Sequence, residues 1–195
     1  MEKEKITLEK QIPRIISIGI LWGIVELYGS RILKGLQPEL FSIWMPFIVA
    51  LLLISAKRLA PMRGSVLLMG VIAALMKFFF AGMSVEGPFI AILCEAALAE
   101  ALFVLLGVNF RADISVGVGL QLYSAFHPLL TKGLFCNSIH FVKFKRWVLN
   151  ESLFKRFEWG DTSVMAFFLA LHVLAGIFAA LLFAAGIKLK EGVKK

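Results

Sequence analysis

The sequence from Ser163 to Ile187, SVMAFFLALHVLAGIFAALLFAAGI, contains no Asp, Glu, Lys or Arg and ends just before Lys188. A helix needs about 20 mainly apolar residues to cross the hydrocarbon core of a bilayer, and this run is long enough to do so. Its only ionisable side chain is His172. We therefore interpret the run as a transmembrane helix.

The whole chain has the composition of a membrane protein. Of its 195 residues, 59% are hydrophobic and 17% are charged, whereas the apolar share of a soluble domain is about 45–50%. This composition excludes a soluble nucleotide-binding enzyme, a disulfide-based scaffold and a disordered chain. The net charge of +8 does not indicate nucleic acid, because the Lys and Arg flank apolar runs, where they anchor to lipid head groups.

Six apolar runs predict an all-α integral membrane protein, a bundle of about six transmembrane helices. The predicted helices cover residues 13–30, 41–56, 64–80, 88–107, 114–135 and 163–187. The whole chain, 1–195, is predicted to form a single transmembrane domain. It begins with a cytoplasmic N-terminal segment, residues 1–12, that is rich in Lys and Glu.

A basic, aromatic segment separates the fifth and sixth predicted helices. Residues 136–162 interleave Lys and Arg with Phe and Trp. Rings at the level of the head groups and cations in water are typical of a segment that lies on the membrane surface. We therefore predict an interfacial loop here, divided near Asn150, a residue type that caps helices.

The distribution of Lys and Arg predicts the orientation. With both termini inside, twelve Lys and Arg lie on the cytoplasmic side and eight on the outer side. Six of those eight belong to the long fifth connection, where the positive-inside rule weakens. We therefore predict a multi-pass protein of the cell membrane with both termini in the cytoplasm.

Five ionisable side chains interrupt the predicted helices at similar depths. Glu26, Lys77 and His127 each lie about 13 residues from the inner ends of their helices, about 20 Å along the axis. Glu95 and His172 lie roughly 10–14 Å below the outer ends of theirs. In a core about 30 Å thick these positions share one layer. Because such groups need a partner or water inside a membrane, we predict that they line a substrate-binding cavity open to the outside.

Two further residues are predicted at this cavity, whose mixed charge suits a small zwitterionic or heterocyclic ligand. Trp22 precedes Glu26 by one helical turn, and its ring would stack on the ligand. Glu86 lies in the short link 82–88 and would reach into the mouth. As alternatives, Trp22 would be an interfacial anchor and the link an ordinary turn.

The charged groups also have a structural interpretation. Lys77 with Glu26 or Glu95 would form a buried ion pair that fixes helix register, and the two histidines would be core residues bonded to their neighbours. Glu100 lies five residues after Glu95, about 140° around the helix, so it would face another helix or a partner.

In size, predicted crossings and several short stretches, the chain resembles the substrate-binding S components of energy-coupling factor (ECF) transporters. The stretches are the first helix around Gly19 and Gly23, the run Arg63-Gly64 through Gly70 to Lys77, and Gly87-Pro88-Phe89-Ile90-Ala91-Ile92 followed by Glu95. The resemblance implies capture of a vitamin, a vitamin precursor or a metal-related nutrient from outside. It also implies partners, a transmembrane coupling subunit and two ATPase subunits that supply the energy.

The resemblance assigns a coupling role to the first helix, because a small-residue motif there contacts the coupling subunit in that family. By this carry-over, Gly19 and Gly23 would be the partner-coupling residues. The sequence also allows another role, since both glycines share a face with Glu26 at i, i+4 and i+7 and would then pack inside the bundle.

The chain has no Gly-Lys-Ser/Thr phosphate loop, so it is not predicted to hydrolyse ATP or to be an enzyme. No cofactor and no metal are predicted. Two alternatives stay open. One is an intramembrane enzyme that uses Glu95, Glu100, His127 and His172 in acid–base chemistry or as metal ligands, and the other is a non-catalytic accessory protein that binds lipid or a partner through residues 139–159.

Overall fold

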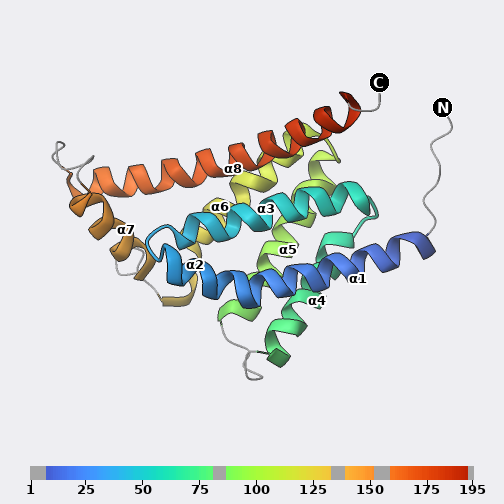
Figure 1. The fold of residues 1–195 in the computed structure, drawn as a ribbon, viewed down its shortest axis with the longest axis horizontal. Coiled ribbons are helices and arrows are strands. Elements are labelled where there is room, and N and C mark those ends of the chain that lie inside the picture. The colour runs from blue at the N-terminus through green and yellow to red at the C-terminus, as the bar shows by residue number, and fades with distance from the viewer. Residues whose placement is uncertain (1–7, 81–86, 133–138, 152–158, 193–195) are drawn as a thin grey trace.

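The structure is a computed structural model that describes residues 8–80, 87–132, 139–151 and 159–192, all of its regular elements being helical. The elements are α1 (Leu8–Ile24), η1 (Val25–Gly29), α2 (Ser30–Leu36), α3 (Phe41–Leu59), α4 (Ser65–Phe80), α5 (Gly87–Leu106), α6 (Phe110–Lys132), α7 (Ile139–Asn150) and α8 (Asp161–Gly192). Figure 1 shows that α7 lies at one end of the bundle, whereas α1 begins and α8 ends at the other.

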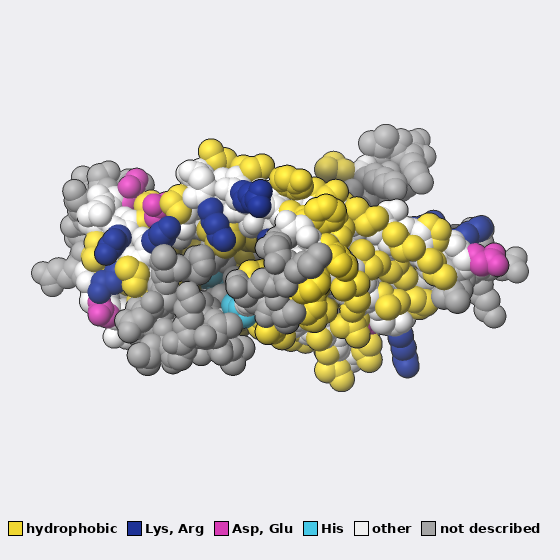
Figure 2. All heavy atoms as spheres, turned by 90° about the horizontal axis from the view of Figure 1, so that it is seen from below, with side chains coloured by type: hydrophobic (Ala, Val, Ile, Leu, Met, Phe, Trp, Pro, Cys, Tyr) yellow, Lys and Arg dark blue, Asp and Glu magenta, His cyan; other side chains and the backbone are white. Residues whose placement is uncertain are grey.

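Within the residues that the structure describes, four helical stretches are long and apolar enough to cross a membrane: Glu9–Leu36, Phe41–Leu59, Gly87–Leu106 and Asp161–Leu189. Their outer faces carry large exposed hydrophobic side chains, among them Ile16, Leu174 and Phe178. Figure 2 shows a broad apolar surface, with Lys and Arg gathered mainly toward the end at which α7 lies. A surface of this kind fits lipid rather than water. The all-α class and the multi-pass membrane architecture that the sequence predicted are therefore confirmed.

The helix bounds differ from the predicted ones mainly at the first and last helices. Arg31 was expected to follow the first helix, but η1 and α2 continue it through Arg31 and Lys34 to Leu36. Both cations are exposed, so they do not force the helix to end. α8 is longer than predicted at both ends, and α7 forms within the predicted surface segment 136–162.

Small residues set the closest contacts between helices. A Cβ atom added to Gly176 of α8 would lie 2.6 Å from the backbone of Gly117 in α6. A Cβ atom added to Gly70 of α4 would lie 2.2 Å from Cβ of Ala96 in α5, and 3.2 Å from the ring of Trp22 in α1. Helices in lipid associate closely at such positions because the backbones can approach. These contacts draw α1, α4 and α5 together around the buried Trp22.

Candidate functional site

A polar group forms where η1 and α4 meet, and its centre is Glu26. Glu26 lies in η1, a π-helical turn inserted between α1 and α2, and such turns are frequent at functional sites. Its main-chain oxygen accepts hydrogen bonds from Nζ of Lys77 at 2.7 Å and from Oγ of Ser30 at 2.6 Å. The Lys77 ammonium also interacts electrostatically with the Glu26 carboxylate. Glu26 and Lys77 are therefore brought together, as their equal depths predicted.

Glu95 of α5 approaches the same place. Its carboxylate interacts electrostatically with that of Glu26. Its Oε2 atom is buried and has no hydrogen-bond partner in the described part of the chain. Nε1 of Trp22 lies near the Glu26 carboxylate but outside hydrogen-bond geometry, and within the same described residues it is also buried and unpartnered. The group thus contains one unused buried acceptor and one unused buried donor.

α6 contributes Tyr123 and His127 to the edge of this group. The Tyr123 hydroxyl and Nδ1 of His127 are 2.9 Å apart, and their ring centroids are 5.3 Å apart. The hydroxyl also interacts with Cys94 and Glu95 of α5. Sequence analysis missed Tyr123, although its position four residues before His127 places both side chains on one face of a helix.

Trp22 is fully buried, so it does not act as an interfacial anchor, and its ring lies inside the bundle beside the polar group. Glu86, the remaining residue predicted at the mouth, lies outside the described residues.

His172 lies apart from this group, in the contact between α8 and α3. Pro46 has no N–H and cannot donate to the carbonyl oxygen of Ser42, four residues earlier. Nε2 of His172 lies 3.1 Å from that oxygen, and Oγ of Ser124 donates to it at 3.2 Å. Nδ1 of His172 lies 2.8 Å from the main-chain oxygen of Phe168, and the ring is fully buried. These contacts favour the structural role that the sequence left open for this histidine over substrate binding.

A second polar network surrounds Glu100, which was predicted to face another helix or a partner, although its contact with Lys57 was not predicted. Its Oε1 accepts hydrogen bonds from Nζ of Lys57 at 2.7 Å and from the N–H of Gly64 at 2.8 Å, while Oε2 accepts from the N–H of Val66 at 2.9 Å. Nζ of Lys57 also donates to the main-chain oxygen of Met62 at 2.9 Å. The carboxylate therefore caps the start of α4 and neutralises a lysine that is only 2% exposed.

A neighbouring ion pair links α3 to α6. Nη2 of Arg58 lies 2.6 Å from Oδ2 of Asp113, whose side chain is buried. Lys57 and Arg58 directly follow the predicted helix 41–56, and no partner was predicted for either. The signal that could have revealed these partners is that the predicted topology places Glu100 and Asp113 near the same side of the membrane as Lys57 and Arg58.

Gly19 and Gly23 face α4 within this chain. A Cβ atom added to Gly19 would lie 2.9 Å from Cβ of Ile72, and one added to Gly23 would lie 2.7 Å from Sδ of Met76. Both glycines are buried. Their face is therefore covered by α4, in line with the alternative of packing inside the bundle, and it is closed to a coupling subunit in this conformation.

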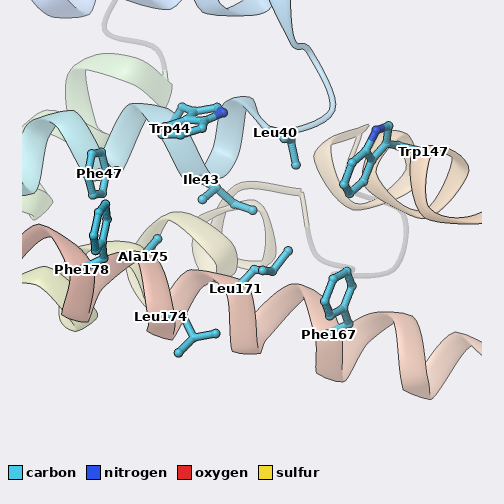
Figure 3. A pocket seen from close by; sticks show the side chains of 10 residues that line it. All are labelled: Leu40, Ile43, Trp44, Phe47, Trp147, Phe167, Leu171, Leu174, Ala175 and Phe178. Carbon is cyan, nitrogen blue, oxygen red and sulfur yellow. The ribbon is translucent and has the colours of Figure 1, made fainter. Parts of the chain in front are cut away.

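A cavity of about 430 Å³ lies elsewhere, between α3, α7 and α8. Figure 3 shows ten side chains around it, among them Trp44 and Phe47 of α3, Trp147 of α7, and Phe167 and Phe178 of α8. Its lining is entirely apolar and includes no residue of the predicted substrate site.

Within the described residues, no group of three or more His, Cys, Asp or Glu side chains is placed to hold a metal ion. Comparison of the chain with protein-family models, curated proteins and solved structures found no match.

Proposed function

We propose that this protein is the membrane-embedded substrate-binding subunit of a nutrient uptake transporter. The observation that carries the proposal is the convergence of Glu26, Lys77 and Glu95 from three helices, beside two buried polar atoms that have no described partner. A buried polar group without a hydrogen bond costs about 1–3 kcal/mol. A ligand that supplies both missing partners recovers this free energy when it binds.

The unused atoms define the chemistry of the ligand. Oε2 of Glu95 needs a donor, and Nε1 of Trp22 needs an acceptor. A small heterocycle or zwitterion with a donor and an acceptor on one edge satisfies both. A positively charged donor on the ligand would further favour the ionised form of the Glu26 and Glu95 carboxyl groups. A vitamin or vitamin precursor has this size and polarity.

The proposed topology places the site toward the outside. In this proposal α4 and α6 also cross the cell membrane, which gives six crossings with both termini in the cytoplasm. Lys77 lies 12 residues beyond Ser65 on α4, a distance of about 18 Å, and Ser65 lies beside Lys57 in the network at the opposite end. The resemblance to ECF S components supplies the partners, a transmembrane coupling subunit and ATPase subunits.

Ligand identification and binding measurements on the purified protein test the proposal directly. Mass spectrometry of the detergent-solubilised protein should find one small molecule in stoichiometric amount, and calorimetry with that molecule gives its dissociation constant. Glu95→Gln replaces the carboxyl group by an amide and removes a hydrogen bond to the ligand worth about 0.5–1.5 kcal/mol, so binding should weaken roughly 2- to 13-fold. Lys77→Met should weaken it as well, whereas Glu151→Gln, on an exposed residue after α7, should not.

The same variants separate binding from structure. If Glu95 and Lys77 serve only to fix helix register, their variants lower the unfolding temperature and leave the affinity of the folded fraction unchanged. Normal binding by both variants would show that the polar group is not the substrate site.

A further inference from the structure

The apolar cavity between α3, α7 and α8 has the dimensions of a single hydrocarbon chain. Its lining on α8 extends from Phe167 to Phe178, which is 11 residues or about 16 Å. This length is close to half of the roughly 30 Å hydrocarbon core, the depth of one leaflet. A volume of about 430 Å³ over that length leaves a groove roughly 6 Å wide, about half the 10–12 Å diameter of a helix with its side chains.

One end of this groove is bordered by α7, which carries exposed positive charge. Trp147 lines the groove, and Lys143, four residues earlier, shares its side of the helix. Lys143 and Arg146 are both exposed, and no acidic partner for either is found among the described residues. Lys145 instead pairs with Asp161 at the start of α8, which attaches α7 beside the groove.

Two tryptophans place this border near the membrane surface. Trp44 and Trp147 both line the groove, and Nε1 of Trp44 donates to Oε1 of Gln37 in the polar link before α3. Tryptophan is enriched at the level of the head groups, with its ring toward the apolar side. The cations of α7 therefore lie where a lipid phosphate lies.

We propose that this groove binds one anionic phospholipid, with an acyl chain between α3 and α8 and the phosphate at Lys143 and Arg146 of α7. The acyl chain packs against the apolar lining, and the exposed cations distinguish an anionic from a zwitterionic head group. The site is separate from the polar group at Glu26 and is independent of the proposed transport function.

Tryptophan fluorescence in phosphatidylcholine vesicles tests the site. Phosphatidylglycerol with a brominated acyl chain should quench the groove tryptophans at a lower mole fraction than brominated phosphatidylcholine does. Each surface cation contributes about 1 kcal/mol to attraction of an anionic lipid, so the double variant Lys143→Gln/Arg146→Gln should weaken the preference roughly 30-fold. The matched variant Arg63→Gln/Arg111→Gln neutralises two exposed cations outside α7 and should leave it unchanged.

A second pair of variants tests the position of the acyl chain. Ala175 lines the groove, so Ala175→Phe should fill it and abolish the preferential quenching. Ala170→Phe places the same ring on an exposed part of α8 outside the lining and should have no effect. If Ala175→Phe does not insert, the charge variants still decide the question.

Three results would overturn the proposal. The first is equal quenching by the two brominated lipids in the unaltered protein, and the second is an equal loss of preference in both charge-neutralised variants. The third comes from replacing Trp44 or Leu171 by a photoreactive residue: that residue would cross-link to another protein helix instead of to lipid.

Discussion

Replacing Lys57 by Met should destabilise the fold far more than removing an ordinary lysine. The side chain of Lys57 is only 2% exposed, and its ammonium lies 2.7 Å from Oε1 of Glu100. Methionine keeps the length of the apolar stem but leaves the carboxylate buried beside two backbone N–H groups, those of Gly64 and Val66. Breaking a buried ion pair by removing one partner costs about 3–5 kcal/mol.

The free energy of unfolding can be measured by titrating the detergent-solubilised protein with a denaturing detergent. Lys57→Met should lower it by about 3–5 kcal/mol, and the control Lys188→Met, on an exposed residue near the end of α8, by less than about 0.5 kcal/mol. A double variant with Glu100→Gln should be more stable than Lys57→Met alone, because the unpaired charge is gone. A stabilising role of the ion pair would be refuted if Lys57→Met behaved like Lys188→Met, or if the effects of Lys57→Met and Glu100→Gln were additive.

Two further predictions concern the contacts of α8. His172→Leu should cost about 0.5–1.5 kcal/mol of unfolding free energy in the natural sequence, because Ser124 still donates to the Ser42 oxygen. The cost should be smaller in a Pro46→Ala background, where the alanine N–H can donate to the same oxygen. Equal costs in both backgrounds would contradict this role. Gly176→Ala should cost about 1–3 kcal/mol by overpacking, because its Cβ would lie within 2.6 Å of the α6 backbone. The control Gly186→Ala meets open space and should instead stabilise its helix by about 0.5–1 kcal/mol, so a loss of similar size at both glycines would show that close packing is not the cause.

The class of the fold could be predicted from the sequence because lipid imposes a length and a composition on any helix that crosses it. The helix ends were harder to place. The predicted first helix ends at residue 30, just before Arg31, but exposed cations are compatible with a helix interior, and the helix continues to Leu36.

The candidate site was predictable in part because depth can be counted along each helix. The 1.5 Å rise placed Glu26 and Lys77 at one level, and they are in contact through the Glu26 main chain. Depth does not give direction around the axis, however, so it could not separate His172, which was predicted at the same level but contacts α3. The π-helical turn at Glu26 also changes the angular position of everything after it, and periodicity assumes a regular helix.

The polar groups around Glu100 and around Glu26 differ in how completely their hydrogen bonds are satisfied, and on this difference we propose a structural role for the first and a functional role for the second. Around Glu100, both carboxylate oxygens and the paired ammonium have hydrogen-bond partners, so nothing is left for a ligand and the group holds α3, α4 and α5 together. Around Glu26, an acceptor on Glu95 and a donor on Trp22 remain unused, and a protein that needed only stability would gain by replacing them with apolar residues. The free energy of unfolding should therefore fall when Lys57 is changed, and ligand affinity should fall when Glu95 is changed. Each variant should alter mainly one of these two quantities. Measuring both quantities on both variants tests this assignment, and a large loss of stability in Glu95→Gln would contradict it.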